Sequence, residues 1–295
     1  MPIKISGCIR RVNLILQNKK VGIIGLGQMG KGMAKNLLQK GFDVSVYDMR
    51  TELVQDLKSL GASGASSCSE VASLSDVIIS IVSDDPQTEE VFCGKKGIWV
   101  GARKGSIAII SSTIDPFHCQ RLAAEGEGKG ITVLDAPVSG GKVGADAGTL
   151  TIIVGGGKSD YAKCYPVFKA IGKNIFHAGP IGMGEVAKLI NNYCCLGNRT
   201  VLSEGIALGL KAGLELKLLI RILKVSSGGS TIVQNWARMK AHKKDYEQRK
   251  YGSGLGLLYK DIGLTLKLAR DLEQCLPVAG LCSQIDISNL FNGVE

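Results

Sequence analysis

A doubly wound α/β domain followed by an all-helical domain is the fold that this sequence predicts, and three observations support it. Short apolar runs alternate with segments of helical periodicity up to about residue 180. The first apolar run leads through a glycine-rich turn into a helical segment. Beyond Gly179-Pro180 only long helical segments follow. We therefore expect an N-terminal extension at 1–19, an α/β domain at 20–182 and an all-helical domain at 183–295.

The expected strands are continuously apolar, as parallel strands covered by helices on both faces must be. They are Lys20–Gly25, Phe42–Tyr47, Val77–Val82, Ser106–Ile110, Ile131–Asp135 and Leu150–Val154. Helical segments between them are Met29–Lys40, Leu53–Leu60, a piece from Glu89 to Phe92, and Pro116–Glu125, with Ser83–Pro86 as a loop. The second domain is expected to contain helices at Gly184–Ala212, Leu214–Val225 and Leu255–Asp271. The resulting β-α alternation indicates a mostly parallel sheet.

Composition excludes several classes of protein. Hydrophobic residues make up 45% and charged residues 21% of the 295 residues, which is ordinary for a globular chain and argues against disorder. The net charge is +10, but the basic residues are scattered and no aromatic-rich basic stripe accompanies them. We therefore expect no nucleic-acid partner. Because no apolar run reaches transmembrane length, we also expect no membrane partner.

Cysteine usage and the first twenty residues bear on the compartment. The nine cysteines form no C-x-x-C pair and no metal-ligand spacing with the three histidines, so we expect no metal site. Unpaired cysteines favour reduced thiols and a cytoplasmic location. The basic residues of the N-terminal segment, without any acid, weakly resemble a transit peptide and leave the mitochondrial matrix open. These residues are Lys4, Arg10, Arg11, Lys19 and Lys20.

The glycine-rich turn has the G-x-G-x-x-G spacing of a dinucleotide-binding fingerprint between a strand and a helix. It comprises Gly25, Leu26, Gly27, Gln28, Met29 and Gly30. In such a turn the first glycine permits the tight bend, the second lets the backbone approach a pyrophosphate, and the third lets the helix pack on the strand. The helix N-terminus then presents free N–H groups to the phosphates. The pattern predicts a Rossmann-type cofactor site, although a glycine turn without a ligand shares the spacing.

Asp48 ends the second expected strand, eighteen residues after Gly30. A carboxylate there accepts hydrogen bonds from the ribose hydroxyls and repels a 2′-phosphate, which favours NAD over NADP. Arg50 leaves NADP possible, because its guanidinium could pair with a phosphate. Val82 ends the third expected strand, Ser83 follows it, and Thr113 follows the fourth. We expect all three at the cofactor crevice, which such sheets form at the carboxyl ends of their strands.

Two further segments suggest substrate chemistry. Ser139, Gly140 and Gly141 follow a strand and could expose consecutive N–H groups to a carboxylate, although a plain turn fits the residues equally well. Lys188 and Asn192 lie four apart after a glycine-rich turn, on one face of an expected helix. Together with a nucleotide site, a lysine there suggests hydride transfer with the lysine as proton donor or acceptor. An ordinary surface lysine remains the alternative.

With these motifs in order, the chain resembles the β-hydroxyacid dehydrogenases over roughly residues 20–285. The fingerprint from Gly25 to Leu37 resembles the family's extended cofactor motif, and Asp135–Gly141 its substrate signature. The resemblance implies that Ser139, Gly140 and Gly141 hold the substrate carboxylate. It also implies that Lys188 is the acid–base residue and that Asn192 orients the substrate. Lys260, in a Lys-Asp pair, is implied to reach the cofactor, and a homodimer or homotetramer is implied as the assembly.

Departures from the family pattern concern the substrate. Ser253 stands where many members carry a phenylalanine, seven residues before the Lys-Asp pair, so the identity of the short β-hydroxy acid or semialdehyde stays open. Two rival functions also remain. The chain could be a cofactor-binding regulatory or interaction protein without turnover, or it could reduce imines. Relatives of both kinds usually lack the lysine, which is present here as Lys188. A dehydrogenase or reductase is therefore favoured.

Overall fold

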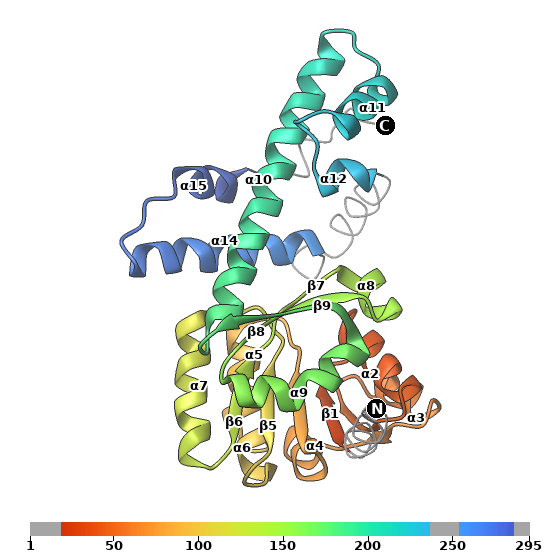
Figure 1. Ribbon diagram of the computed structural model, residues 1–295, viewed down its shortest axis with the longest axis vertical. Coiled ribbons are helices and arrows are strands. Elements are labelled where there is room, and N and C mark those ends of the chain that lie inside the picture. Colours follow the sequence, from red (N-terminus) through yellow and green to blue (C-terminus); the bar gives the residue numbers. More distant parts are fainter. Residues whose placement is uncertain (1–18, 237–253, 286–295) are drawn as a thin grey trace, which may run out of the picture. The chain divides into compact units, whose positions relative to one another are not determined.

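The computed structural model describes residues 19–236 and 254–285 (Figure 1). The chain divides into two compact units, Met1–Lys188 and Leu189–Glu295, with the division inside helix α10 (Met183–Lys211). Ser253 and the first eighteen residues of the predicted N-terminal extension lie outside the described ranges. The predicted fold class is confirmed: a mostly parallel sheet with helices comes first, and a helical region follows.

One sheet forms the centre of the first unit, and its described strands follow the order β3-β2-β1-β4-β5-β6-β8-β7, with β9 paired to β8. They are β1 Lys20–Ile24, β2 Asp43–Tyr47, β3 Ser63–Gly64, β4 Val77–Ser80, β5 Ile107–Ile110, β6 Thr132–Asp135, β7 Val138–Ser139, β8 Leu150–Gly155 and β9 Gly172–Gly179. Strands β1 to β6 pair in parallel, whereas β8 is antiparallel to β6 and β7. The order from β3 to β6 is that of a dinucleotide-binding sheet, whose ligand crevice lies where the strand order reverses, between β1 and β4.

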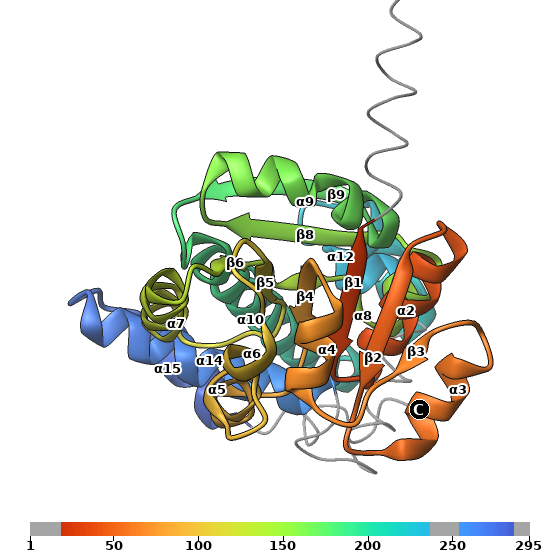
Figure 2. The same cartoon turned by 90° about the horizontal axis from the view of Figure 1, so that it is seen from below.

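Helices cover both faces of this sheet (Figure 2). In the first unit they are α2 Gly30–Gln39, α3 Thr51–Lys58, α4 Cys68–Leu74, α5 Asp85–Cys93, α6 Ile98–Gly101, α7 Pro116–Gly128, α8 Gly141–Ala147 and α9 Lys158–Ile171. Successive strand residues point to opposite faces, so each strand contributes to two cores. Ile79 packs in a cluster with side chains of α2, α3 and α9, and its neighbour Ile78 packs with those of α4 to α7. Burial on both faces explains why these strands are continuously apolar.

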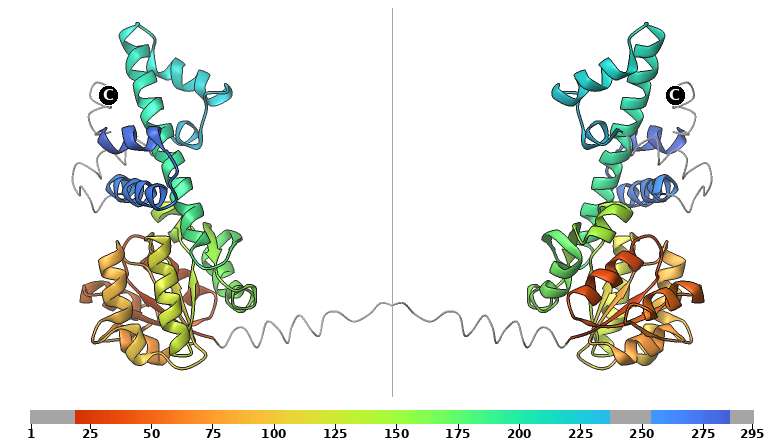
Figure 3. Two further views of the ribbon diagram at one scale, coloured as in Figure 1. Left: turned by 90° about the vertical axis from the view of Figure 1, so that its left-hand side faces the viewer. Right: turned by 90° about the vertical axis from the view of Figure 1, so that its right-hand side faces the viewer.

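The second unit is helical in its described part (Figure 3). Besides the rest of α10 it contains α11 Leu216–Val225, α12 Thr231–Gln234, α14 Gly254–Asp271 and α15 Pro277–Gln284. One small core joins Leu196 of α10 to Ile262 and Cys282, and another joins Ile206 to Ile220 of α11. Among the residues described, no helix is both long and apolar enough to span a membrane.

The structure differs from the sequence prediction at several elements of the first unit. Helix α5 begins at Asp85, so the predicted loop at Ser83–Pro86 is wrong for its second half. The cause is Asp84, whose carboxylate accepts a hydrogen bond from the Gln87 N–H at 2.9 Å and caps the helix. Helix α9 and strand β9 were not predicted, because Pro166 interrupts the helical pattern of α9 and exposed residues interrupt that of β9.

His118 of α7 joins that helix to α5 beside the carboxyl edge of the sheet. Its Nδ1 lies 2.9 Å from Asp85 Oδ1 and its Nε2 lies 2.8 Å from Glu89 Oε2. Arg121 pairs with Glu89 and with Glu125, so the neighbourhood holds three carboxylates and one other cation. The hydrogen bond to Asp85, opposed by burial, and the bond to Glu89 raise the pKa of His118. Protonated His118 therefore stabilises the α5–α7 contact.

This contact predicts a pH-dependent contribution to stability. Because the folded-state pKa is raised, the stabilisation is fully present below the unfolded pKa of about 6.5 and is lost as pH rises through the folded value. The melting temperature of the wild type should exceed that of His118→Gln most at acidic pH, with the difference shrinking at alkaline pH. Differential scanning calorimetry across this range checks it, and a difference independent of pH would contradict it.

Candidate active site

The glycines of the fingerprint are required for two different reasons. Gly25 and Gly30 are required by packing inside the protein. Gly25 has φ +93°, and a Cβ there would lie 2.4 Å from the carbonyl oxygen of Ile81. A Cβ at Gly30 would lie 1.9 Å from the carbonyl oxygen of Gly25. Both positions therefore exclude a side chain whether or not a ligand is bound. They hold the start of α2 directly against the end of β1, as the fingerprint requires.

Gly27 is not required by internal packing, because the protein leaves room beside it for a ligand. Among the described residues, the nearest atom to a Cβ at Gly27 would be Nη2 of Arg50, at 3.9 Å. Packing among the described residues therefore does not explain the glycine. No described side chain caps the first turn of α2, which begins at Gly30, and that turn carries no acidic residue. Open space next to uncapped N–H groups at a helix N-terminus fits the pyrophosphate of a dinucleotide.

Asp48 and Arg50 form a closely bonded pair at the end of β2. Asp48 Oδ2 accepts a hydrogen bond from the Leu26 N–H at 2.7 Å, which ties the carboxylate to the glycine turn. Arg50 donates to both carboxylate oxygens, from Nε at 2.9 Å and from Nη2 at 3.0 Å. Burial opposes ionisation of Asp48, but the hydrogen bonds from Arg50 and Leu26 outweigh it, and the pKa of Asp48 is lowered. A carboxylate thus stands beside the fingerprint with an arginine on its outer side.

The other predicted cofactor residues lie in loops at the same carboxyl edge. The Val82 N–H donates to Ser112 Oγ at 2.8 Å, which joins the loops after β4 and β5. Ser83 is exposed, and its N–H donates to Gln87 Oε1 at 3.3 Å. Thr113 is half-buried directly after Ser112. Gln28 is exposed and Met29 half-buried in the turn that leads into α2.

The segment Ser139–Gly141 is the turn from β7 into α8. Ser139 pairs with Thr151 of β8, and the next two residues both have positive φ, +134° at Gly140 and +62° at Gly141. Such backbone angles favour glycine, so the turn depends on both residues. The segment is therefore a tight, glycine-dependent turn, and the predicted carboxylate contact remains a prediction.

Asn36 connects the cofactor helix to this turn, and sequence reasoning missed it. Its Nδ2 donates to the carbonyl oxygens of Gly32 and Ala145, both at 2.8 Å, and to that of Asp146 at 3.3 Å. A Cβ at Gly32 would lie 2.7 Å from the carbonyl carbon of Ala145, so α2 packs directly on α8. The extended fingerprint contained both residues, but one sequence does not reveal a partner more than a hundred positions away.

Lys188 lies near the start of α10 and is buried, with 8% of its surface exposed. Burial argues against an ordinary solvated lysine, because lysines are almost never buried without a partner. Glu185, one turn earlier, is fully buried, and its Oε2 accepts a hydrogen bond from the Ile114 N–H at 3.3 Å. The helix segment that carries Lys188 is thereby tied to the loop that contains Thr113.

Asn192 and Lys260 belong to the second unit, where they share one partner. Asn192 Nδ2 donates to Asp261 Oδ2 at 2.5 Å, and Lys260 Nζ lies 2.8 Å from Asp261 Oδ1. Asn191 Nδ2 donates to Asn192 Oδ1 at 2.9 Å. Asn192 and Asp261 are both buried. The Asp261 carboxylate therefore fixes the amide of Asn192 and holds the ammonium of Lys260, a contact that the Lys-Asp pair in the sequence did not by itself predict.

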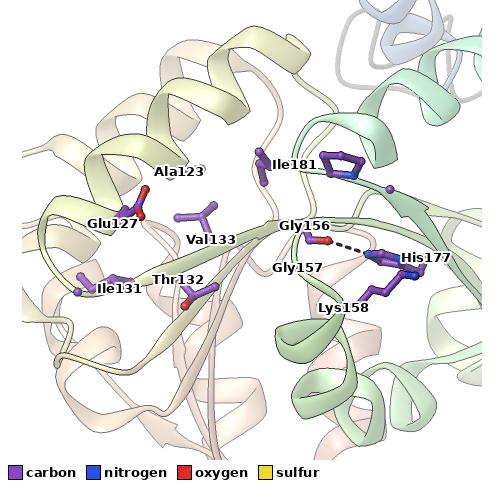
Figure 4. A pocket seen from close by; sticks show the side chains of 13 residues that line it. Ala123, Glu127, Ile131, Thr132, Val133, Gly156, Gly157, Lys158, His177 and Ile181 are labelled. Carbon is purple, nitrogen blue, oxygen red and sulfur yellow. Dashed lines mark hydrogen bonds between the residues drawn. The ribbon is translucent and has the colours of Figure 1, made fainter.

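A groove of about 750 Å³ lies elsewhere in the first unit, between α7 and the start of α9 (Figure 4). Thr132 and Val133 of β6 line it, and Nε2 of His177 donates a hydrogen bond to the carbonyl oxygen of Gly156 at 2.7 Å. None of the predicted site residues is among the residues that line it. The groove is therefore distinct from the fingerprint at β1.

Comparison with known proteins covers both parts of the chain. Residues 20–179 match the family described as the NAD-binding domain of 6-phosphogluconate dehydrogenase. Residues 182–288 match the family described as the NAD-binding region of NADP-dependent 3-hydroxyisobutyrate dehydrogenase.

Individual relatives agree with these matches. An NAD-dependent L-serine dehydrogenase of Pseudomonas aeruginosa is 36% identical over 266 residues, 89% of each chain. A 3-hydroxyisobutyrate dehydrogenase of the same organism is 35% identical over 268 residues, 90% of each chain. The crystal structure of 3-hydroxyisobutyrate dehydrogenase from Salmonella typhimurium has a TM-score of 0.81 at 27% identity, covering 93% of this chain and 99% of its own. The family matches and the sequence identity to these dehydrogenases agree with the glycine fingerprint and with the buried lysine on α10. The chain therefore belongs to the β-hydroxyacid dehydrogenase family of NAD(P)-dependent oxidoreductases.

Proposed function

We propose that this enzyme transfers a hydride between NAD(P) and a short β-hydroxy acid or its semialdehyde, with Lys188 as the general acid and base. The observation that carries the proposal is the buried Lys188 on a helix whose first turn is fixed to the carboxyl edge of the cofactor sheet. The helix turn that carries this lysine is held through Glu185, which binds Asp135 of β6 and the Ile114 N–H of the loop after β5. Such pre-organisation is what proton transfer to a substrate oxygen requires.

In this proposal each residue of the site has a separate role in the reaction. A nicotinamide cofactor held at the Gly25–Gly30 turn would supply the hydride acceptor or donor for the substrate's β-carbon. Neutral Lys188 removes the proton from the β-hydroxyl during oxidation, and its ammonium returns a proton to the oxygen during reduction. Ser139, Gly140 and Gly141 hold the substrate carboxylate through backbone N–H groups. Asn192, its amide fixed by Asp261, orients the substrate, and Lys260 contacts the cofactor.

The proposed substrate class is supported by the substrates for which similar proteins are named. It does not rest on any one side chain of this protein. Similar proteins are named for L-serine, 3-hydroxyisobutyrate and 2-(hydroxymethyl)glutarate. All three compounds carry a hydroxyl on the carbon β to a carboxylate. We propose a substrate of this kind, or a related aldehyde acid. Tartronate semialdehyde, succinic semialdehyde and glyoxylate are the candidates. One methylene more or less changes binding by only about 1–3 kcal/mol, so several of these compounds should react.

The assembly and the compartment are proposed on two observations. Val201 and Leu208 on α10 expose 67% and 71% of their surface, and Ile222 on α11 exposes 44%. Apolar residues so exposed suit a contact between subunits. We therefore propose a homodimer or homotetramer, and a monomer in sedimentation-velocity runs would contradict it. The described cysteines are all free thiols, which suits a reducing compartment such as the cytoplasm or the mitochondrial matrix.

Lys188→Ala is expected to lower kcat by about 10²- to 10⁴-fold, the usual contribution of general acid–base catalysis. Lys188→Arg should be similarly impaired, because arginine keeps the charge but does not release a proton at neutral pH. NADH production is measured with 3-hydroxyisobutyrate and L-serine, and NAD(P)H consumption with tartronate semialdehyde, succinic semialdehyde and glyoxylate. Dissociation constants for NADH come from fluorescence titration.

Lys163→Ala is the matched control, because Lys163 is an exposed helical lysine of the same unit that pairs with Asp160. It should retain normal turnover. Full activity in Lys188→Ala would contradict the role of Lys188. A wild type that binds NADH but turns over none of these compounds with either cofactor would instead favour a regulatory or interaction protein.

Asp48→Asn is expected to lower the preference for NAD over NADP by about tenfold or more. The change removes the carboxylate that repels a 2′-phosphate and releases Arg50 to pair with it. Asp76→Asn is a close control, because Asp76 also accepts from a backbone N–H, that of Lys20, and from an arginine, Arg103. The ratio of kcat/KM for the two cofactors measures the effect. An unchanged ratio in Asp48→Asn would contradict this role of the pair.

A further inference from the structure

Asp135 is a fully buried carboxylate that the proposed chemistry does not use. It is the last residue of β6 and has 0% of its surface exposed. Its Oδ1 accepts a hydrogen bond from the Gly182 N–H at 2.7 Å, and its Oδ2 accepts one from the Glu185 N–H at 2.8 Å. Glu185 lies in the first turn of α10, and Gly182 directly precedes that helix. The first N–H groups of a helix have no partner inside it, so Asp135 supplies partners from the sheet.

The surroundings of Asp135 are shaped for a carboxylate. A Cβ at Gly155 would lie 2.2 Å from Oδ1, and a Cβ at Gly184 would lie 2.6 Å from Oδ2. Glycine on both sides therefore leaves the space that the two oxygens occupy. A negative charge is also favourable at the positive end of a 29-residue helix. Burial raises the pKa of Asp135, and the hydrogen bonds from the backbone N–H donors act in the opposite direction.

A second contact holds the same helix turn. Glu185 donates its N–H to Asp135 and accepts the Ile114 N–H with its own carboxylate. The first turn of α10 is thus fixed at two places, the end of β6 and the loop after β5. Lys188 follows Glu185 by three residues, less than one helical turn. Because a helix is rigid over such a distance, a shift at Glu185 moves Lys188 with it.

We propose that Asp135 is a positioning residue for the reaction: it sets where α10 begins and so places the Lys188 ammonium relative to the substrate oxygen. The proposal rests on the proposed role of Lys188. It separates two tasks within one signature, because Asp135 positions the lysine while Ser139–Gly141 holds the substrate carboxylate. Asp135 has no exposed surface, so the proposal gives it no contact with substrate or cofactor.

The test compares Asp135→Asn with Ser67→Ala. Asparagine keeps the size of Asp135 but turns an NH₂ group toward one of the two helix N–H donors, so the start of α10 must shift. Ser67 Oγ accepts the Glu70 N–H at 3.1 Å and caps α4, a helix of the same unit without a proposed site residue. Both variants lose a helix cap, and only the first is coupled to Lys188. Asp135→Ser is a second variant, with a smaller hydroxyl acceptor in place of the carboxylate.

We expect kcat to fall by about 10- to 100-fold in Asp135→Asn, since a misplacement of about 1 Å can cost that much. KM and the dissociation constant of NADH should stay within about twofold of the wild type. The solvent deuterium isotope effect on kcat should increase, because proton transfer by a displaced Lys188 becomes slower. Ser67→Ala should lower the melting temperature without changing kcat or the isotope effect.

Three results would overturn the proposal. One is a folded, NADH-binding Asp135→Asn or Asp135→Ser enzyme with normal kcat. Another is a fall in kcat that comes with an equal loss of NADH binding. The third is failure of both variants to yield NADH-binding protein, which would make the role of Asp135 purely structural. If Lys188→Ala keeps wild-type kcat, the proposed function fails as well; if Lys188→Ala is impaired and Asp135→Asn is not, only the positioning role fails.

Discussion

The hydrogen bonds that the Asp135 carboxylate accepts from Gly182 and Glu185 fix the start of α10 to the sheet, and the proposed site geometry rests on them. They join the last residue of a central strand to the helix that carries Lys188. Without such partners, the first N–H groups of α10 would be buried without acceptors, which costs about 1–3 kcal/mol for each group. The sheet thus determines where the helix starts. A parallel sheet with a buried core on each face is a rigid base for that purpose.

The same edge of the sheet carries the cofactor fingerprint, and each of its conformational requirements has a separate cause. Gly25 and Gly30 are required by contacts inside the protein, whereas a Cβ at Gly27 would meet only Arg50, at van der Waals distance. Asp48 is bonded both to the turn, through Leu26, and to Arg50. The cofactor helix in turn carries Asn36, which binds the carbonyl groups at the end of α8. Hydrogen bonds therefore join three segments to one sheet and its helices. The segments are the glycine turn of the fingerprint, the turn at Ser139–Gly141 and the start of α10.

The sequence predicted the parts of this scaffold that have local causes. Strands such as Val77–Ser80 are buried on both faces, so their apolar runs were visible without knowledge of their neighbours. The glycine turn was recognisable because its spacing and its place between strand and helix are local. Strand β9 was not predicted, since exposed residues interrupt its apolar pattern. The start of α5 was misplaced because Asp84 was taken for a loop residue and not for a cap.

Contacts between distant residues explain what the sequence could not predict of the site. The motifs named Lys188, Asn192 and Ser139, but not the bonds that hold them. Asp135 meets Gly182 across 47 positions, and Asn192 meets Asp261 across 69. Such pairs form only when the chain folds. A single sequence therefore does not reveal which distant residues will be in contact. Asp135 belongs to the segment Asp135–Gly141 that resembles a substrate signature, but the sequence does not indicate that its two oxygens accept from Gly182 and Glu185.

A crystal structure of the enzyme with NADH and an unreactive analogue of a β-hydroxy acid tests the central claim most directly. The account predicts Lys188 Nζ within about 3 Å of the analogue's β-oxygen. It also predicts the carboxylate on the N–H groups of Ser139–Gly141, and Asp135 still bonded to Gly182 and Glu185. A β-oxygen far beyond hydrogen-bond reach of Lys188, with another side chain in its place, would contradict it.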